Sequence, residues 1–244
     1  MTQFKPAALL PILLVLSACA TAPADETALI ADPYEGTNRG IHGFNKGVDT
    51  ALLRPASRAW GAVMPEPAER VVENFMGNLA LPGDMVNNVL QGDGDALGNN
   101  LGRFLMNTTI GIGGLLDVAG DAGITRQEAD FGQTLALYGV EEGPYVELPL
   151  LGPSTARDAV GTVVDMITNP LGLSESETAE DILAGVAIVG PIDTRDQFAG
   201  VIDGVLYESE DSYEAAKIAY IQARRAFVNG TEAGDDGFVD IYAE

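Results

Sequence analysis

The chain has 244 residues, 36 of them acidic and 13 basic, and its formal net charge is −23. Such a surface repels nucleic acid and anionic head groups, so the composition excludes nucleic acid as a partner and electrostatics as a means of membrane attachment. The length suggests one domain with a real core, and the single cysteine, Cys19, excludes an intramolecular disulfide.

The first 18 residues are typical of a signal peptide. Lys5 precedes an apolar run over 7–16, and small residues stand just before Cys19. The Leu-Ser-Ala-Cys sequence ending at Cys19 resembles the bacterial lipobox, which predicts diacylglyceryl and acyl chains on this cysteine. Each buried methylene of such chains contributes about 0.8 kcal/mol to membrane binding. By analogy with bacterial sorting, Ala20 favours the outer membrane, with the protein facing the periplasm.

Residues 19–31 contain Pro23 and no hydrophobic periodicity, which predicts a lipidated tether. Residues 231–244 are rich in acidic residues, and we expect this tail to be disordered. The segment between them, 32–230, is predicted to form one domain.

Helical periodicity dominates the N-terminal half of this domain, where apolar residues recur at steps of three and four. The pattern predicts a helix through Ile41, Phe44, Val48 and Leu52 that ends at Arg54-Pro55, a second over 56–63, a third through Val71, Phe75 and Leu79 that ends at Pro82-Gly83, a short apolar segment over 85–90 and a helix over 95–107.

The C-terminal half repeats the pattern. It predicts helices through Val160, Val164 and Ile167, ending at Asn169-Pro170; through Ile182, Val186 and Val189, ending at Gly190-Pro191; from an N-cap at Asp193 through Phe198, Val201 and Val205; and over 211–228. Residues 143–153 contain three prolines and predict an irregular, extended crossing between the two halves. The fold class is therefore all-α, with helices interrupted unusually often by proline and glycine.

The segment 104–116 holds thirteen residues without a charge. A helix that crosses a bilayer needs about 20 apolar residues, so this run is too short to span one. Its residues alone leave two interpretations, a buried core segment or a wall that faces lipid.

A search for catalytic and metal-binding residues finds little. His42 is the only histidine, and we interpret it as structural. The run 92–104 matches a calcium loop only in part, because Leu97 and Phe104 occupy positions that need oxygen ligands. The sequence therefore predicts no catalytic residue, no metal and no cofactor beyond the lipid on Cys19.

A series of short motifs points to a known family. They are Asp32-Pro33-Tyr34-Glu35-Gly36, Asn38-Arg39 and Phe44-Asn45; Asn74-Phe75 and Asn78-Leu79; Val86-Asn87 and Leu90-Gln91-Gly92; Arg103-Phe104 and Asn107-Thr108; Gly113-Gly114 and Asp117-Val118-Ala119; Phe131-Gly132, Tyr138-Gly139-Val140, Gly143-Pro144-Tyr145-Val146, Leu148-Pro149 and Arg157-Asp158. In this order, over about 32–230 and behind a lipobox, they resemble the VacJ/MlaA family of outer-membrane lipoproteins.

The resemblance implies a ring of helices in the inner leaflet of the outer membrane, with an amphipathic channel through the ring. Such proteins remove misplaced phospholipids from the outer leaflet and pass them to a soluble periplasmic carrier, which feeds an inner-membrane ABC transporter. They associate with trimeric porins, and no covalent step is involved.

Particular residues are assigned to this activity as hypotheses. A gate at Phe44 and Asn45, a channel wall at Asn107 and Thr108 and a hinge at Gly139 and Gly143 are expected; a core phenylalanine and turn glycines are the alternatives. The residues expected in the membrane are Phe104, Leu105, Ile110, Ile112, Leu115 and Leu116.

Two other functions compete with lipid transport. One is a structural envelope lipoprotein that binds porins without moving lipid. The other is a lipid hydrolase, which the apparent lack of a nucleophile–base pair disfavours.

Overall fold

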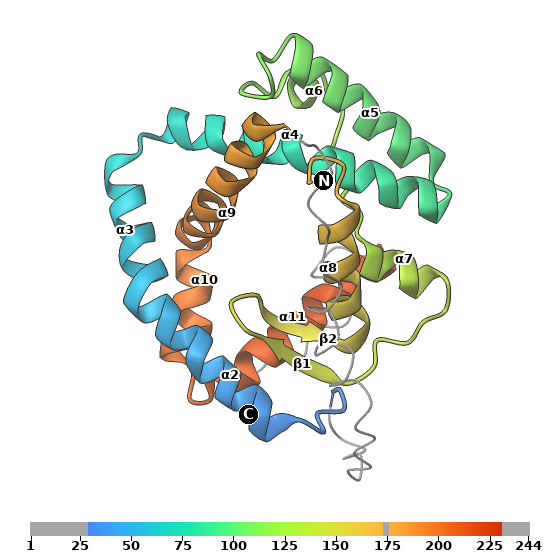
Figure 1. Cartoon of the computed structure of the whole chain (residues 1–244). Coiled ribbons are helices and arrows are strands. Elements are labelled where there is room, and N and C mark those ends of the chain that lie inside the picture. Colours follow the sequence, from blue (N-terminus) through green and yellow to red (C-terminus); the bar gives the residue numbers. More distant parts are fainter. Residues whose placement is uncertain (1–28, 173–175, 231–244) are drawn as a thin grey trace.

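The computed structural model describes residues 29–172 and 176–230. The predicted signal peptide, Cys19, most of the tether and the acidic tail lie outside these residues, so those assignments stay predictions. Within the described part the fold is helical, as predicted, with one small addition of two β-strands (Figure 1).

The chain begins with one long helical path in three parts. These are α2 (Glu35–Val48), a π-helical turn η3 (Asp49–Leu53) and α3 (Arg54–Val63). The predicted break at Arg54-Pro55 is wrong, because Pro55 falls in the first turn of α3, where a missing N–H is tolerated. The Arg54 N–H bonds five residues back to Asp49, and this wider turn carries the path past the proline.

The next element, α4 (Glu66–Gln91), runs through Pro82. The prediction that a helix ends there is wrong, and the separately predicted segment over 85–90 belongs to α4. An interior proline costs about 3 kcal/mol. Tertiary hydrogen bonds beyond Pro82 offset this cost, including Asn87 to Asp165 at 2.9 Å and Asn100 to Asn88 at 2.8 Å.

Short elements then lead into the second half. They are α5 (Gly94–Thr109), α6 (Val118–Asp121), α7 (Phe131–Leu137), β1 (Tyr145–Leu148), β2 (Gly152–Thr155) and α8 (Ala156–Thr168). The strands pair antiparallel, with Tyr145 opposite Thr155 and Leu148 opposite Gly152. The irregular crossing expected over 143–153 is thus a β-hairpin, because Pro149 lies in its turn and Pro153 needs no ladder donor.

The chain closes with α9 (Glu177–Gln197), α10 (Ala199–Asp203), a second π-helical turn η4 (Gly204–Glu208) and α11 (Ser212–Asn229). Helix α8 ends before Pro170, as predicted. Pro191, however, lies inside α9, and Asp193 is not an N-cap. Asp193 is 2% exposed and accepts the Trp60 indole N–H at 3.1 Å, so a contact with α3 replaces the predicted helix start.

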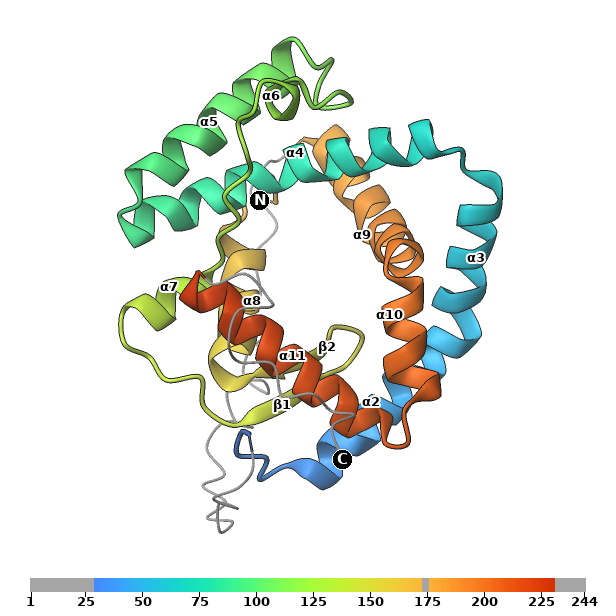
Figure 2. The same cartoon turned by 180° about the vertical axis from the view of Figure 1, so that it is seen from behind.

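The helices are arranged as a ring (Figures 1 and 2). Helices α3, α4 and α8 follow one another around it, α9 and α10 run inside α3, and α11 crosses behind the hairpin. Helices α5 and α6 project outward beyond α4. A small apolar core of Ile30, Tyr145, Tyr213 and Ile221 lies where α11 meets the hairpin.

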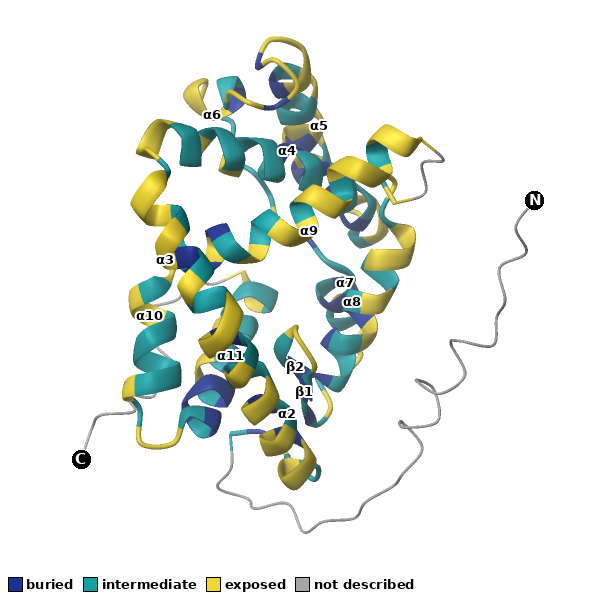
Figure 3. Cartoon of the chain, turned by 60° about the vertical axis from the view of Figure 1, so that its left-hand side comes forward, coloured by how far each residue is buried: buried dark blue, intermediate teal, exposed yellow. Residues whose placement is uncertain are grey.

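Burial in this ring departs from the usual pattern of apolar residues inside. The buried residues include more polar and charged than apolar ones, whereas many large aliphatic residues are exposed. In Figure 3, exposed residues run along α3 and α9, and buried residues gather near β1 and β2. A contiguous exposed apolar surface usually marks a partner, a ligand or a membrane.

Candidate functional site

The most apolar exposed segment is the end of α5 and the loop that follows it. Five of the six residues predicted to lie in a membrane are exposed: Leu105 by 54%, Ile110 by 65%, Ile112 by 66%, Leu115 by 37% and Leu116 by 47%. Phe104 is half-buried. The alternative that 104–116 is a buried core segment is therefore wrong.

Several backbone groups of the same loop are hydrogen-bonded within the protein. The N–H groups of Gly113 and Leu116 donate to Thr108 and Gly111, each at 3.0 Å, and Asn74 on α4 donates to the Leu115 carbonyl at 3.3 Å. Two buried glycines permit this tight path. A Cβ on Gly111 would stand 2.3 Å from the Leu116 oxygen, and one on Gly114 would stand 2.6 Å from the Asn78 Cβ. A loop that faces hydrocarbon needs such internal pairing, because lipid offers its backbone no partner.

The two residues predicted to form a channel wall differ in exposure: Asn107 is buried and Thr108 is exposed. Asn107 is 3% exposed; it donates to Asp117 at 2.8 Å and accepts the Ala119 N–H at 2.9 Å. Its side chain therefore holds α5 to α6 and is unavailable to a passing lipid. Thr108 is exposed and accepts from Asn78 at 3.1 Å.

The two predicted gate residues on α2 have different surroundings. Phe44 is 53% exposed, which excludes the alternative of a core phenylalanine. Asn45 binds the hairpin turn: its amide donates to the Leu148 carbonyl at 2.9 Å and accepts the Leu150 N–H at 2.7 Å. Leu150 has a φ of +67° and is 69% exposed. Asn45 thus fixes a strained hairpin tip that presents an apolar side chain.

The predicted hinge glycines both adopt left-handed conformations, with φ of +83° at Gly139 and +68° at Gly143. Between them, Glu142 forms an ion pair with Arg225 on α11, and its carbonyl accepts the Arg157 N–H at 3.1 Å. The two glycines therefore supply the positive φ angles that these turns require. Any movement of this segment would have to break the Glu142 ion pair.

Ion pairs hold α9 and α10 against the first helical path. Arg195 on α9 donates to Asp49 of η3 at 2.8 Å and also pairs with Asp203, which Arg54 binds at 2.8 Å. Tyr207 of η4 donates to Asp49 at 2.6 Å. Hydrogen bonds from Arg54 and Arg195 lower the pKa of Asp203 to about 2. The two π-helical turns thus meet at Asp49, which accepts from both Tyr207 and Arg195, a contact that no local sequence signal predicts.

A hydroxyl group lies beside the single histidine. Ser212 Oγ is 3.1 Å from His42 Nε2, His42 Nδ1 is 3.4 Å from Glu147 Oε1, and the Lys46 ammonium donates to Ser212 at 3.2 Å. The structure therefore brings a serine hydroxyl into contact with the histidine, which the sequence analysis did not predict. The sequence did not reveal the pair because its members are 170 residues apart.

Among the described residues, no helix has both the length and the apolar character needed to cross a membrane. The structure thus combines a ring of helices with an exposed apolar surface at α5 and its loop, and with a hairpin tip that Asn45 holds in place.

Comparisons with known proteins agree with one another. The MlaA lipoprotein family model matches residues 30–227. The "Intermembrane phospholipid transport system lipoprotein MlaA" of Escherichia coli (strain K12) is 38% identical over 222 residues, which cover 89% of this chain and 86% of that protein. The protein of the same name from Shigella flexneri has the same identity and coverage.

A solved structure shares the fold as well. A chain described under "Structural basis for maintenance of bacterial outer membrane lipid asymmetry" matches with a TM-score of 0.70 and 39% identity, covering 82% of this chain and all of that one. The match in sequence and the match in fold lead to the same conclusion, and the chain belongs to the MlaA lipoprotein family.

Proposed function

We propose that this chain moves phospholipid: it removes misplaced phospholipids from the outer leaflet of the outer membrane, through its ring, and so maintains lipid asymmetry. The observation that carries the proposal is the exposed apolar end of α5 and its loop, with a backbone paired internally. Ten helical residues extend about 15 Å, which is half the hydrocarbon thickness of about 30 Å. These dimensions suit a protein seated in one leaflet.

Attachment and partners follow from the same proposal. Acyl chains on Cys19 anchor the protein to the outer membrane with its bulk facing the periplasm. A soluble periplasmic carrier accepts the lipid and delivers it to an inner-membrane ABC transporter, and a trimeric porin holds the ring in place. No step forms or breaks a covalent bond.

The testing experiment measures phospholipid exposed in the outer leaflet of a deletion strain complemented with variants. Deletion should raise the exposed phospholipid, and the wild-type gene should reverse the rise. Cys19→Ala should fail because the anchor is lost, and Ile110→Glu should fail because a charge enters the apolar loop. Ile110→Val is the matched control and should complement. An unchanged outer leaflet on deletion would favour the structural, porin-binding lipoprotein instead.

Ester hydrolysis is a second candidate, supported by the Ser212–His42–Glu147 arrangement. In such a reaction Ser212 would attack the ester carbonyl while His42 takes its proton and passes it to the departing lysophospholipid; water would then hydrolyse the acyl-serine, releasing the fatty acid and restoring the serine. Purified protein incubated with phospholipid tests this directly. Fatty acid release that Ser212→Ala abolishes would support it, and intact lipid bound within the protein, with no release, supports transport.

A further inference from the structure

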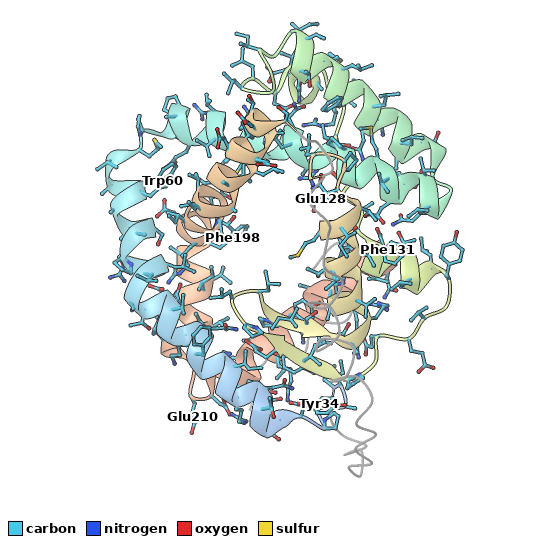
Figure 4. All side chains as sticks on the ribbon, in the orientation of Figure 1. Tyr34, Trp60, Glu128, Phe131, Phe198 and Glu210 are labelled. Atoms are coloured by element: carbon cyan, nitrogen blue, oxygen red, sulfur yellow. The ribbon has the colours of Figure 1, made fainter. Side chains whose placement is uncertain are left out.

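A pocket of about 220 Å³ lies where α4 meets the C-terminal end of α8. This junction is at the edge of the ring, beside the corner marked by Glu128 in Figure 4. Small residues on its walls (Ala80, Gly83 and Ala129) leave the space open, and a Cβ on Gly83 would meet no atom within 4 Å. Since a water molecule occupies about 30 Å³ in the liquid, the pocket has room for a small organic group.

Apart from Val86, the rest of the lining is polar and carries negative charge. Its polar members are Asp84, Asn87, Asp165, Thr168 and Asn169. The charge of Asp84 is matched by Arg126, which donates to it at 2.7 Å. Asp84 is buried, and this burial raises the pKa of its carboxyl despite the arginine.

Asp165 is different, because its hydrogen-bond partners are neutral. Its two oxygens accept from the Asn87 amide at 2.9 Å and from the Phe131 N–H at 3.0 Å. No ion pair of Asp165 is found within residues 29–172 and 176–230. A carboxylate has about four lone-pair sites, so Asp165 can accept further donors. The end of α8 adds partial negative charge from its last carbonyl groups.

The combination of free volume, an uncompensated carboxylate and a helix C-terminus favours a cationic group with N–H donors. None of the pocket's lining residues is aromatic. Because a quaternary ammonium is usually held by an aromatic cage, the lining disfavours that group as a ligand. An anionic head group would be repelled by Asp165. A primary ammonium can donate three hydrogen bonds to the carboxylate, the Asn169 side chain and the helix carbonyls.

We infer that this pocket binds the primary ammonium of a zwitterionic phospholipid head group and makes the ring selective for such lipids. The inference rests on the proposed transport function and adds its substrate class. Asp165 is the selecting residue, and the small walls at Gly83 admit the head group.

The test is lipid capture by the purified full-length protein. The protein is incubated with vesicles holding equal amounts of phosphatidylethanolamine, phosphatidylcholine and phosphatidylglycerol, and the retained lipid is identified by mass spectrometry. We expect the wild type to enrich phosphatidylethanolamine roughly two- to fivefold, the range that a partly exposed ion pair contributes. Asp165→Asn should retain as much total lipid without this preference.

Because Asp165→Asn also alters two internal hydrogen bonds, Gly83→Leu provides a second variant. It fills the pocket and leaves both carboxylates in place, and it should abolish the preference as well. Asp181→Asn removes an exposed charge from α9 and is the matched control, which should keep the wild-type preference. A melting curve for each variant confirms that it is folded.

The possible results distinguish failure of the head-group inference from failure of the proposed transport function. Lipid retained without head-group preference, or a preference that survives both pocket variants, overturns the inference and leaves transport standing. No retained lipid in the wild type overturns both. Free ethanolamine is tested alone by calorimetry: binding that depends on Asp165, together with no lipid preference, would assign the pocket to a soluble amine and overturn the lipid inference.

Discussion

Single side chains with two or more tertiary hydrogen bonds hold the functional parts of this molecule in place. Asn45 is the clearest case, because one amide both donates to and accepts from the hairpin turn. Its neighbour Phe44 is exposed on the same helix and makes no such link. The gate at Phe44 and Asn45 stays a prediction, and the structure shows that Asn45 positions the hairpin tip.

Asn45→Ala should loosen the hairpin tip and lower the free energy of unfolding by about 1–3 kcal/mol, because two backbone groups lose their partner. Hydrogen exchange at 148–151 should speed up. Phe44→Ala is the neighbouring control and should leave this exchange unchanged. Equal exchange in the two variants would show that Asn45 does not position the tip.

Asp158 predicts a pH dependence of stability. Burial opposes its ionisation, but hydrogen bonds from Arg224 at 3.0 Å and from Arg157 at 3.0 Å prevail and hold the pKa below its usual value. A carboxyl whose pKa is lower in the folded state stabilises the fold above its unfolded pKa of about 3.9. This contribution is lost as the pH falls from about 4 through the folded pKa.

Asp158→Asn should therefore unfold more easily at pH 7, by about 3–5 kcal/mol, since it leaves a buried arginine without its partner. Its stability should also fall less steeply between pH 4 and pH 2. Chemical unfolding at several pH values measures both effects. Parallel pH profiles in the two proteins would exclude Asp158 as the titrating group.

At the scale of elements, glycine positions decide whether the exposed loop after α5 can form. Gly111 lies against backbone atoms, with the Leu116 and Asn107 oxygens 2.3 and 2.6 Å from a Cβ built there. Gly113 has open space around it but a φ of +73°. Gly98, inside α5, has neither restriction. Replacing each of these three glycines by alanine is therefore expected to change stability by a different amount.

Gly111→Ala should lower the melting temperature most, because backbone atoms on both sides must move. Gly113→Ala should cost about 1–2 kcal/mol for its left-handed backbone. Gly98→Ala should stabilise α5 by about 0.5–1 kcal/mol, because alanine is the better helix former. Thermal melts of the three variants give the order, and a Gly111 variant as stable as the Gly98 variant would contradict the close approach.

In the molecule as a whole, charges hold α9 and α10 against the first helical path, and the apolar core found among the described residues is small. The side chains of Arg195 and Asp49 are 5% and 7% exposed, so each buried charge needs the other to offset its loss of hydration. A buried pair adds little net stability against apolar replacements, but the loss of one partner is costly. Many large aliphatic residues meanwhile remain exposed on the surface.

Arg195→Met should destabilise the protein by about 3–5 kcal/mol, because it leaves Asp49 and Asp203 without a shared cation. Arg70→Met removes an exposed pair with Glu66 and should cost less than about 0.5 kcal/mol. The double variant Arg195→Met, Asp49→Leu should recover part of the loss. Denaturant unfolding of the double variant and of both single variants, Arg195→Met and Asp49→Leu, measures the coupling, and single effects that simply add would argue against an interaction between Arg195 and Asp49.

The sequence by itself determined the helical class, the positions of most helices and the family. These depend on local signals: apolar periodicity, the stop at Pro170 and the ordered series of short family motifs. The tertiary structure decided that Pro55, Pro82 and Pro191 lie within helical paths, and that 145–155 forms a hairpin. It also decided that Asn107 and Asp193 serve packing. A local pattern records how a proline restricts its own backbone, but hydrogen bonds from residues distant in sequence decide whether a helix continues past it.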